Sequence, residues 1–358
     1  MRILAFESSC DETSAAVVTV ENGKFKIESN IIASQVETHK LYGGVVPEIA
    51  SRAHVEAISS ITYEALETAK CTLRDVDLVA VTANPGLIGA LLVGVNFAKS
   101  LAISNCIPLV AVDHIKGHIA AAYLGNTPAR PPFIALTISG GHTAIYKVKS
   151  YSEIEMIGTT RDDAIGESFD KIGRIIGIPY PAGRGFDELS REGFIKATRE
   201  SESFYEKYKK SDAYKNRDMT LPSPIISGDT LDFSFSGLKT AAINLLHKYE
   251  MKGEEIDRAL FAARYTYEAV EAVKKRIGEA LTKNPGYALV VSGGVAANSH
   301  IRSILTTLAE KEKREVHIPP VSLCGDNAAM IAAAGYYEYL ENKLADSSLN
   351  ASALDSIL

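Results

Sequence analysis

Two segments of this chain repeat one pattern, an apolar run that ends in Ser-Gly-Gly. The first reads IALTISGGHTA over residues 134–144, and the second reads ALVVSGGVAAN over residues 288–298. A related turn, VTANPGLIG, occupies residues 81–89. Strands that end in glycine-rich turns present backbone N–H groups at one edge of a sheet, where a phosphate can approach closely. The repetition therefore predicts an α/β chain in which several turns line one nucleotide site.

The elements predicted around these turns fall into two halves. The first half has the order βββαβαβ, which is typical of half of a doubly wound fold, and the second half begins again with a strand at residue 133. We expect residues 1–132 and a C-terminal helix at about 326–345 to form one lobe, and residues 133–325 to form the other. No GxxxxGK[ST] or GxGxxG sequence opens a helix, which argues against a P-loop enzyme and a standard Rossmann dehydrogenase.

Parts of the second half have a less regular pattern. We expect a helix at about 159–177 and a Pro/Gly loop, PYPAGRGFD, at 179–187. Residues 196–232 are charged, rich in tyrosine and long, and we interpret them as a lid-like surface insertion. The tail after Lys343 is rich in Ser, Ala and Asp, and we expect it to fray.

Composition limits the class of protein. The net charge is −6, so a nucleic acid would have to bind to a local basic patch or through a partner. The N-terminus turns polar after six residues, which predicts a first strand and no signal or transit peptide. We expect no membrane span, because polar residues interrupt every long apolar stretch. The cysteines show no CxxC spacing, which favours reduced thiols in the cytoplasm: they are Cys10, Cys71, Cys106 and Cys324.

The segment LVAVDHIKGH, residues 109–118, ends a predicted strand with two histidines. His114 and His118 are four residues apart, so on a helix both imidazoles project from one face. That spacing suits two ligands of one metal ion, and Asp326 in LCGDNAAM is the best distant candidate for a third. The same spacing also occurs without any metal, and Asp326 could instead cap a helix.

The chain carries nine longer strings in a characteristic order. They are FESSCDETSAAVV, YGGVVPEIASRAH, NPGLIGALLVG, DHIKGH, ISGGHT, DDAIGESFDK, LDFSFSGLKT, VSGGVAAN and CGDNAAMIA. From residue 1 to about 340 the chain resembles the tRNA N6-adenosine threonylcarbamoyltransferase family, of the bacterial TsaD type. The resemblance implies a two-lobed actin/Hsp70/sugar-kinase (ASKHA) fold with a central nucleotide cleft. It also implies transfer of threonylcarbamoyl from threonylcarbamoyl-AMP to N6 of adenosine 37 in tRNAs reading codons that begin with A.

The same resemblance implies roles for particular residues. The metal ligands would be His114, His118 and Asp326, and Glu12 would act near the reacting end. The substrate-binding residues would be Thr137, Ile138, Ser139, Gly140, Gly141, Asp170, Gly183, Asp187 and Asn298. The ligand set implies one divalent metal ion per subunit, with iron(II) expected first and zinc or magnesium as alternatives. Without the resemblance, Asp170 and Asp187 also fit surface acids, and Asn298 fits a helix cap.

The resemblance also implies partners in the cytoplasm. These are tRNA, threonylcarbamoyl-AMP, a shorter paralogous TsaB-type subunit and a TsaE-type P-loop ATPase, with a homodimer as the arrangement of organellar members. The insertion offers candidate tRNA contacts, in which cations meet phosphates and tyrosines stack on bases. These candidates are Lys207, Lys209, Lys210, Lys215, Arg217, Tyr205, Tyr208 and Tyr214. A solvated lid without RNA contacts remains the alternative.

Three other functions fit parts of the pattern. A metalloprotease is disfavoured because HIKGH lacks the glutamate of HExxH. His-His-Asp is formally the facial triad of an iron(II) oxygenase, but the glycine turns suit a nucleotide better. The third is an ATP-binding switch or scaffold of the actin/Hsp70 type without transferase activity, which should tolerate His118→Ala.

Overall fold

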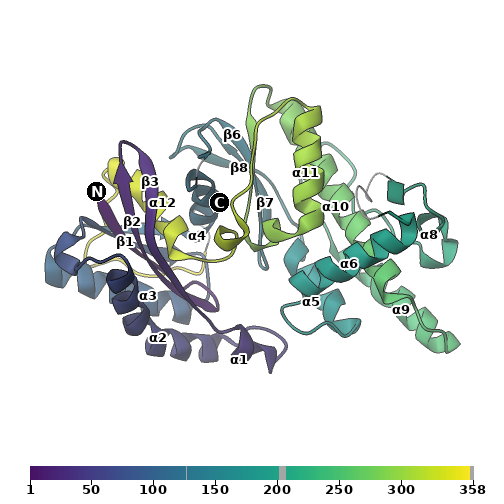
Figure 1. Ribbon diagram of the computed structural model, residues 1–358, viewed down its shortest axis with the longest axis horizontal. Helices are drawn as coiled ribbons and strands as arrows, with labels where there is room; N and C mark the ends of the chain where they lie inside the picture. Colours follow the sequence, from purple (N-terminus) through teal and green to yellow (C-terminus); the bar gives the residue numbers. More distant parts are fainter. Residues whose placement is uncertain (126, 201–206, 355–358) are drawn as a thin grey trace.

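The computed structural model describes residues 1–125, 127–200 and 207–354. Two five-stranded mixed sheets stand side by side, with helices on their faces (Figure 1). The strand orders are β3-β2-β1-β4-β5 and β10-β9-β6-β7-β8. In each sheet, three antiparallel strands come first in the chain and two parallel strands are then added. The two halves predicted from the sequence therefore share one topology.

The first sheet is buried on both faces. Alternate residues of β1 point to opposite faces, as in any strand. Leu4 and Phe6 pack with α2 and α3, whereas Ile3 and Ala5 pack with α4 and α12. The strands are β1 (Arg2–Glu7), β2 (Glu12–Glu21), β3 (Lys24–Ser34), β4 (Leu78–Asn84) and β5 (Leu109–Asp113). The helices are α1 (Val36–Lys40), α2 (Pro47–Thr68), α3 (Ile88–Asn105), α4 (His114–Ala120) and α12 (Ala328–Leu340).

The second sheet and its helices enclose the largest apolar core. Leu136 and Ile145 of the sheet share this core with Phe261 of α10 and Ile304 of α11. The strands are β6 (Phe133–Ile138), β7 (Thr143–Val148), β8 (Ile154–Thr159), β9 (Ala288–Ser292) and β10 (Val316–His317). The helices are α5 (Ile165–Ile175), α6 (Gly183–Thr198), α8 (Asp212–Lys215), α9 (Ser236–Lys252), α10 (Arg258–Lys283) and α11 (Ser299–Lys311).

Three predictions of local structure were wrong. The helix expected at 159–177 begins only at Ile165, and residues 154–159 form the edge strand β8. The predicted Pro/Gly loop ends early, because α6 begins at Gly183. The described part of the tail, up to residue 354, is held in place: the backbone N–H of Ala345 donates to the Leu109 carbonyl at 2.8 Å, and that of Ser352 donates to the Ala83 carbonyl at 2.9 Å. Tertiary hydrogen bonds thus order a segment whose composition favours disorder.

The described part of the insertion packs on the far side of α6 from the first sheet (Figure 1). Tyr208 is completely buried against Phe194 of α6 and Tyr267 of α10. Tyr214 is held by Arg264, whose guanidinium lies 4.0 Å from the ring centroid. Tyr208 therefore cannot stack on a base, which corrects that part of the prediction. Tyr205 lies outside the described residues.

In the described ranges, α3 alone is long and apolar enough to cross a membrane by length and composition. Helices in protein cores pass the same test. One face of α3 is buried in the core between the first sheet and α2, through residues that include Val95, Ala98 and Ala102. This packing buries 33% of the helix inside the structure.

Candidate functional site

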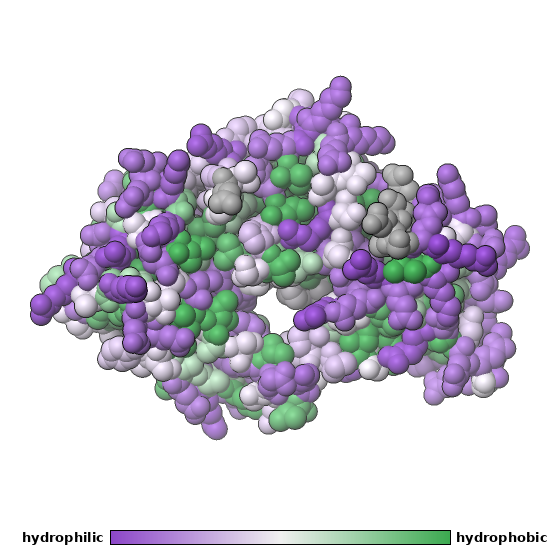
Figure 2. Space-filling model, in the orientation of Figure 1, coloured by the Kyte–Doolittle hydropathy of each residue, from purple (hydrophilic) through white to green (hydrophobic). Residues whose placement is uncertain are grey.

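A cavity of about 1190 Å³ lies between the two sheets and is lined by turns from both. Strand register explains why these turns meet. Thr137 of β6 lies opposite Ser292 of the parallel strand β9, so the two Ser-Gly-Gly turns leave the sheet side by side. Phe6 of β1 lies opposite Val81 of β4, so the turns that follow those strands are also adjacent. Figure 2 shows the hollow near the centre of the face.

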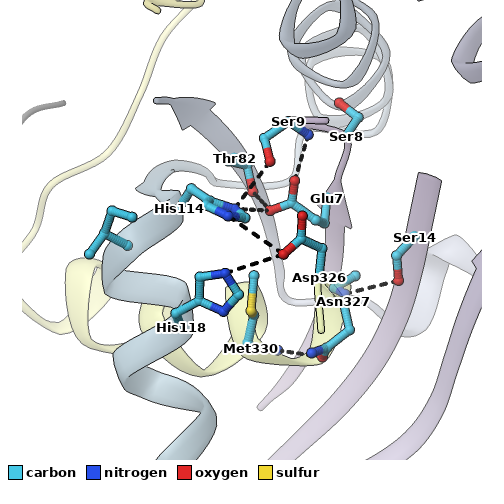
Figure 3. A network of polar contacts seen from close by, with 12 residues as sticks. Glu7, Ser8, Ser9, Ser14, Thr82, His114, His118, Asp326, Asn327 and Met330 are labelled. Carbon is cyan, nitrogen blue, oxygen red and sulfur yellow. Dashed lines mark hydrogen bonds and ion pairs between the residues drawn. The ribbon is translucent and has the colours of Figure 1, made fainter. Parts of the chain in front are cut away.

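The three predicted metal ligands come together beside this cavity: His114 and Asp326 line it, and the completely buried His118 lies next to them. Their ligand atoms all lie within 4.8 Å of one another. His114 Nε2 is 3.6 Å from Asp326 Oδ1, and His118 Nε2 is 3.2 Å from the same oxygen (Figure 3). The structure therefore brings residues from β5–α4 and from the start of α12 to one point.

The residues that cap α4 and α12 leave the side chains of His114, His118 and Asp326 free of capping roles. The Asp113 carboxylate accepts hydrogen bonds from Ile115 N and Lys116 N, so α4 begins directly after β5 and places both histidines in its first two turns. Asn327, and not Asp326, caps α12 by accepting from Met330 N at 3.1 Å. The alternative in which Asp326 is a helix cap is therefore wrong.

The chemistry of the cluster fits a divalent cation. Both ring nitrogens of His118 are buried, and neither makes an aligned hydrogen bond to another described residue. A buried polar atom without a partner costs about 1–3 kcal/mol, which metal coordination would offset. Burial alone would raise the pKa of Asp326, but His114 and His118 hold that pKa well below its usual range. Two imidazoles and one ionised carboxylate form a donor set suited to iron(II) or zinc.

Glu12 is the first residue of β2 and also lines the cavity. Its carboxyl Oε1 accepts a hydrogen bond from Ser34 Oγ at 3.1 Å. Burial, together with the nearby Asp326 and Asp11 carboxylates, raises the pKa of Glu12 to about 9. A carboxyl group with this pKa is neutral at pH 7 and can donate a hydrogen bond.

The opposite wall is formed by the Ser-Gly-Gly turns. Ser139, Gly140 and Gly141 line the cavity. Thr137 and Ile138 do not, because both are fully buried within β6. Gly140 and Gly141 have no atom within 4 Å of the position that a Cβ would take, so their backbones face open space.

The remaining predicted substrate residues also line the cavity, but they already make bonds within the protein. Asp170 accepts from Ala182 N at 2.7 Å, and Asp187 accepts from Ser299 N at 3.1 Å. Asn298 Oδ1 caps α11 by accepting hydrogen bonds from His300 N and Ile301 N. The helix-cap interpretation therefore holds for this oxygen. Gly183, at the start of α6, faces open space. A ligand that binds here would therefore contact Asp170, Asp187 and Asn298 while these side chains keep their hydrogen bonds to the protein backbone.

The profile of one known family, the tRNA N6-adenosine threonylcarbamoyltransferases (TsaD), matches residues 26–333. The chain belongs to this family. A Clostridium botulinum (strain 657 / Type Ba4) protein of that name is 47% identical over 351 residues, which cover 98% of this chain and 96% of the relative. The Clostridium perfringens (strain 13 / Type A) protein is 46% identical over 349 residues, with the same coverage. The family identified from the sequence strings is thus confirmed, and the protein is a transferase that acts on tRNA.

Solved structures at low sequence identity confirm the fold of this family member. HypF from T. kodakarensis has a TM-score of 0.59 at 13% identity, covering 99% of this chain and 49% of that protein. Component A of (R)-2-hydroxyglutaryl-CoA dehydratase from Acidaminococcus fermentans has a TM-score of 0.51 at 14% identity, with 95% and 99% covered. These likenesses support the predicted actin/Hsp70/sugar-kinase type of fold and nothing more.

Sequence reasoning missed two residues of this candidate site. Glu7 ends β1 below the cavity, and its Oε2 lies 3.0 Å from His114 Nδ1. His142, in the first Ser-Gly-Gly-His turn, lines the cavity, and burial together with His114 and His118 lowers its pKa to about 4. A charged residue at the end of an otherwise apolar strand was the available signal for Glu7, and the extra histidine in one of the two repeats was the signal for His142.

Proposed function

We propose that this protein transfers the threonylcarbamoyl group from threonylcarbamoyl-AMP to N6 of adenosine 37 in tRNAs reading codons that begin with A. In the reaction, N6 attacks the carbamoyl carbon, the bond from that carbon to the phosphate oxygen breaks, AMP leaves and N6 loses one proton. The observation that carries this proposal is one cavity that is lined both by the glycine turns and by His114 and Asp326 of the His-His-Asp cluster. It is large enough for a nucleotide and an extruded base.

The glycine-turn wall suits the AMP part of the donor. The exposed backbones of Gly140, Gly141 and Gly294 can approach a phosphate without a side chain in between. Asp170 and Asp187 have further acceptor capacity for ribose hydroxyls. The Asn298 amide NH₂ can donate to ribose or adenine while its oxygen caps α11.

The acidic and histidine wall suits the reacting end. His114, His118 and Asp326 would hold one divalent metal ion, with iron(II) expected first and zinc or magnesium as alternatives. When bound, such an ion supplies Lewis-acid and template chemistry. Glu12 would donate a hydrogen bond to the carbamoyl oxygen as negative charge develops there. Since the donor is already activated, alignment and charge stabilisation are the main demands on the enzyme.

We also propose how the protein works with others. The paralogous TsaB-type subunit and the TsaE-type ATPase are its proposed partners in the cytoplasm, with a homodimer as the alternative assembly. Exposed cations next to the buried tyrosine cluster are proposed to contact tRNA phosphates. These are Lys207, Lys209, Lys210, Lys215 and Arg217.

The decisive experiment follows labelled threonylcarbamate from pre-made threonylcarbamoyl-AMP to unmodified tRNA. Wild type, His118→Ala and His247→Ala are compared, each with and without the partner proteins. His247 is an exposed residue of α9 and controls for loss of a histidine elsewhere. We expect transfer by wild type and His247→Ala, and loss of about 100-fold or more in His118→Ala, which is the scale of removing a transition-state contact.

Two results would contradict the proposal. Equal transfer by His118→Ala and wild type would remove the histidine cluster from the reaction. Nucleotide binding without any transfer, even with partners present, would favour the switch or scaffold alternative.

A further inference from the structure

We infer that Glu7 is a positioning residue that fixes the ring of His114 so that Nε2 faces the metal position. The inference rests on the proposed function, because it concerns the same histidine cluster. Glu7 ends β1, and Glu12 begins β2 on the other side of the turn between them. Unlike Glu12, Glu7 is not among the residues that line the cavity and lies beneath its wall. Glu7 therefore acts through His114 and not on the substrate.

Every contact of Glu7 is made inside the protein. The residue is 1% exposed. Oε2 lies 3.0 Å from His114 Nδ1 and accepts a hydrogen bond from Thr82 Oγ1 at 2.6 Å, and Oε1 accepts from Ser9 N at 2.5 Å (Figure 3). Burying a carboxylate is costly unless it is fully hydrogen-bonded, so a buried glutamate with three donors is a built feature and not an accident of folding.

The contact with Glu7 determines which nitrogen of His114 can bind a metal. A carboxylate only accepts hydrogen bonds, so Nδ1 carries a proton, and in the neutral imidazole that binds a metal the lone pair is then on Nε2. Nε2 is the atom that faces Asp326, at 3.6 Å. A carboxylate behind a ligand histidine holds the ring orientation and increases the basicity of the coordinating nitrogen.

The two histidines differ in this support. Nδ1 of His118 is buried and makes no hydrogen bond to any residue in the described ranges, so no polar group supports its ring on the side away from Asp326. His114 is held by Glu7 and also lies 3.2 Å from Ser9 Oγ. We therefore expect His114 to be the preorganised ligand of the pair and Glu7 to account for that difference.

Glu7 also connects the histidine to the turn that leads to Glu12. Ser9, whose N–H donates to Glu7, accepts from Leu87 N at 2.8 Å through its own carbonyl. The adjacent Gly86 leaves no room for a side chain, since a Cβ there would lie 2.6 Å from the Ser9 carbonyl oxygen. The Glu7 carboxylate thus contacts both the ring of His114 and the backbone of the β1–β2 turn, and fixes the position of one relative to the other.

The test measures metal binding apart from activity. Wild type, Glu7→Gln and Glu338→Gln are stripped of metal and titrated with zinc(II) against a chromophoric chelator, and with cobalt(II) by visible absorption. Glu338 is a matched control, because it is a buried carboxylate that contacts α4 through Lys116 at 2.7 Å but does not touch a histidine. Glutamine keeps the size of Glu7, but its NH₂ must face a donor.

We expect Glu7→Gln to bind zinc roughly 10–100-fold more weakly, which is the usual effect of losing such a partner. Its cobalt spectrum should also change, whereas Glu338→Gln should match wild type in both. Unchanged zinc affinity and an unchanged cobalt spectrum in Glu7→Gln would overturn the inference. If Glu7→Gln does not fold, Thr82→Val tests the same point, because it removes a donor that fixes Oε2. Several-fold weaker zinc binding by Thr82→Val would support the inference, and wild-type affinity would overturn it.

This design separates the inference from the proposed function. A wild-type protein that binds zinc at His114 but transfers no threonylcarbamate would contradict the function and leave the Glu7 test intact. Conversely, active protein whose metal affinity is independent of Glu7 would contradict only the inference.

Discussion

Ser14 Oγ accepts a hydrogen bond from the backbone N–H of Ala328 at 2.9 Å, across 314 residues of chain. This bond joins β2 to the first turn of α12, where backbone N–H groups have no partner within the helix. Asn30 Oδ1 accepts from the next N–H, that of Ala329, at 3.4 Å. Because Asp326 lies two residues before Ala328, the hairpin of β2 and β3 determines where the third ligand is placed.

Ser14→Ala should therefore affect both stability and metal binding. We expect the free energy of unfolding to fall by about 1 kcal/mol, the usual net value of one buried hydrogen bond. Zinc affinity should fall as well, because the start of α12 is less well fixed. Urea denaturation and chelator competition measure the two effects. Ser60→Ala, at an exposed serine of α2, should change neither quantity.

Gly293→Ala should destabilise the second lobe much more than Gly294→Ala. Gly293 has φ +90°, and a Cβ there would lie 2.2 Å from the Ile138 carbonyl oxygen, whereas Gly294 has open space. Backbone strain of this kind costs about 1–3 kcal/mol before any steric clash is added. Urea denaturation should show this loss for Gly293→Ala and near wild-type stability for Gly294→Ala. Equal effects of the two changes would contradict the packing of the second turn against β6.

Replacing Lys209, Lys210, Lys215 and Arg217 by alanine should weaken tRNA binding without changing nucleotide affinity. Cations that neutralise phosphates release counterions, so the slope of log K against log salt should fall by roughly 1 for each lost contact. Fluorescence anisotropy with labelled tRNA at several salt concentrations measures this slope. Lys311→Ala with Lys313→Ala removes two other exposed cations and should leave it unchanged. An unchanged slope in the fourfold variant would favour a solvated segment without RNA contacts.

Glu12→Gln should raise the free energy of unfolding of metal-free protein at pH 7. The pKa of Glu12 is raised from 4.5 to about 9 in the folded state, chiefly by burial. Below pH 4.5 both states are protonated and the group makes no difference. Between pH 4.5 and 9 only the unfolded chain releases the proton, so this group lowers stability as pH rises, by up to about 1.4 kcal/mol per pH unit. Urea denaturation of both proteins at pH 5 and pH 8 checks this, and a stability difference that does not grow with pH would contradict it.

The sequence by itself determined many of the local elements, though not all of their bounds, and the family. The spacing of His114 and His118 placed both on one helical face, and α4 has that face. Pro47 is the first residue of α2, where a backbone N–H would have no acceptor within the helix, so proline is tolerated there. The repeated Ser-Gly-Gly turns indicated two related halves, because short-range patterns of apolar residues and glycine report local backbone geometry directly.

Only the tertiary structure decided which polar groups meet. Strand register set Glu7 beneath His114, although 107 residues separate them, and no local pattern encodes that distance. Tyr208 was expected to face RNA but is buried against Phe194 of α6 and Tyr267 of α10. The residues next to Tyr208 in the sequence are charged, so they gave no sign of this apolar contact. A sequence records the periodicity of each element, whereas contacts between elements depend on how sheets and helices pack, and the chemistry of this site depends on those contacts.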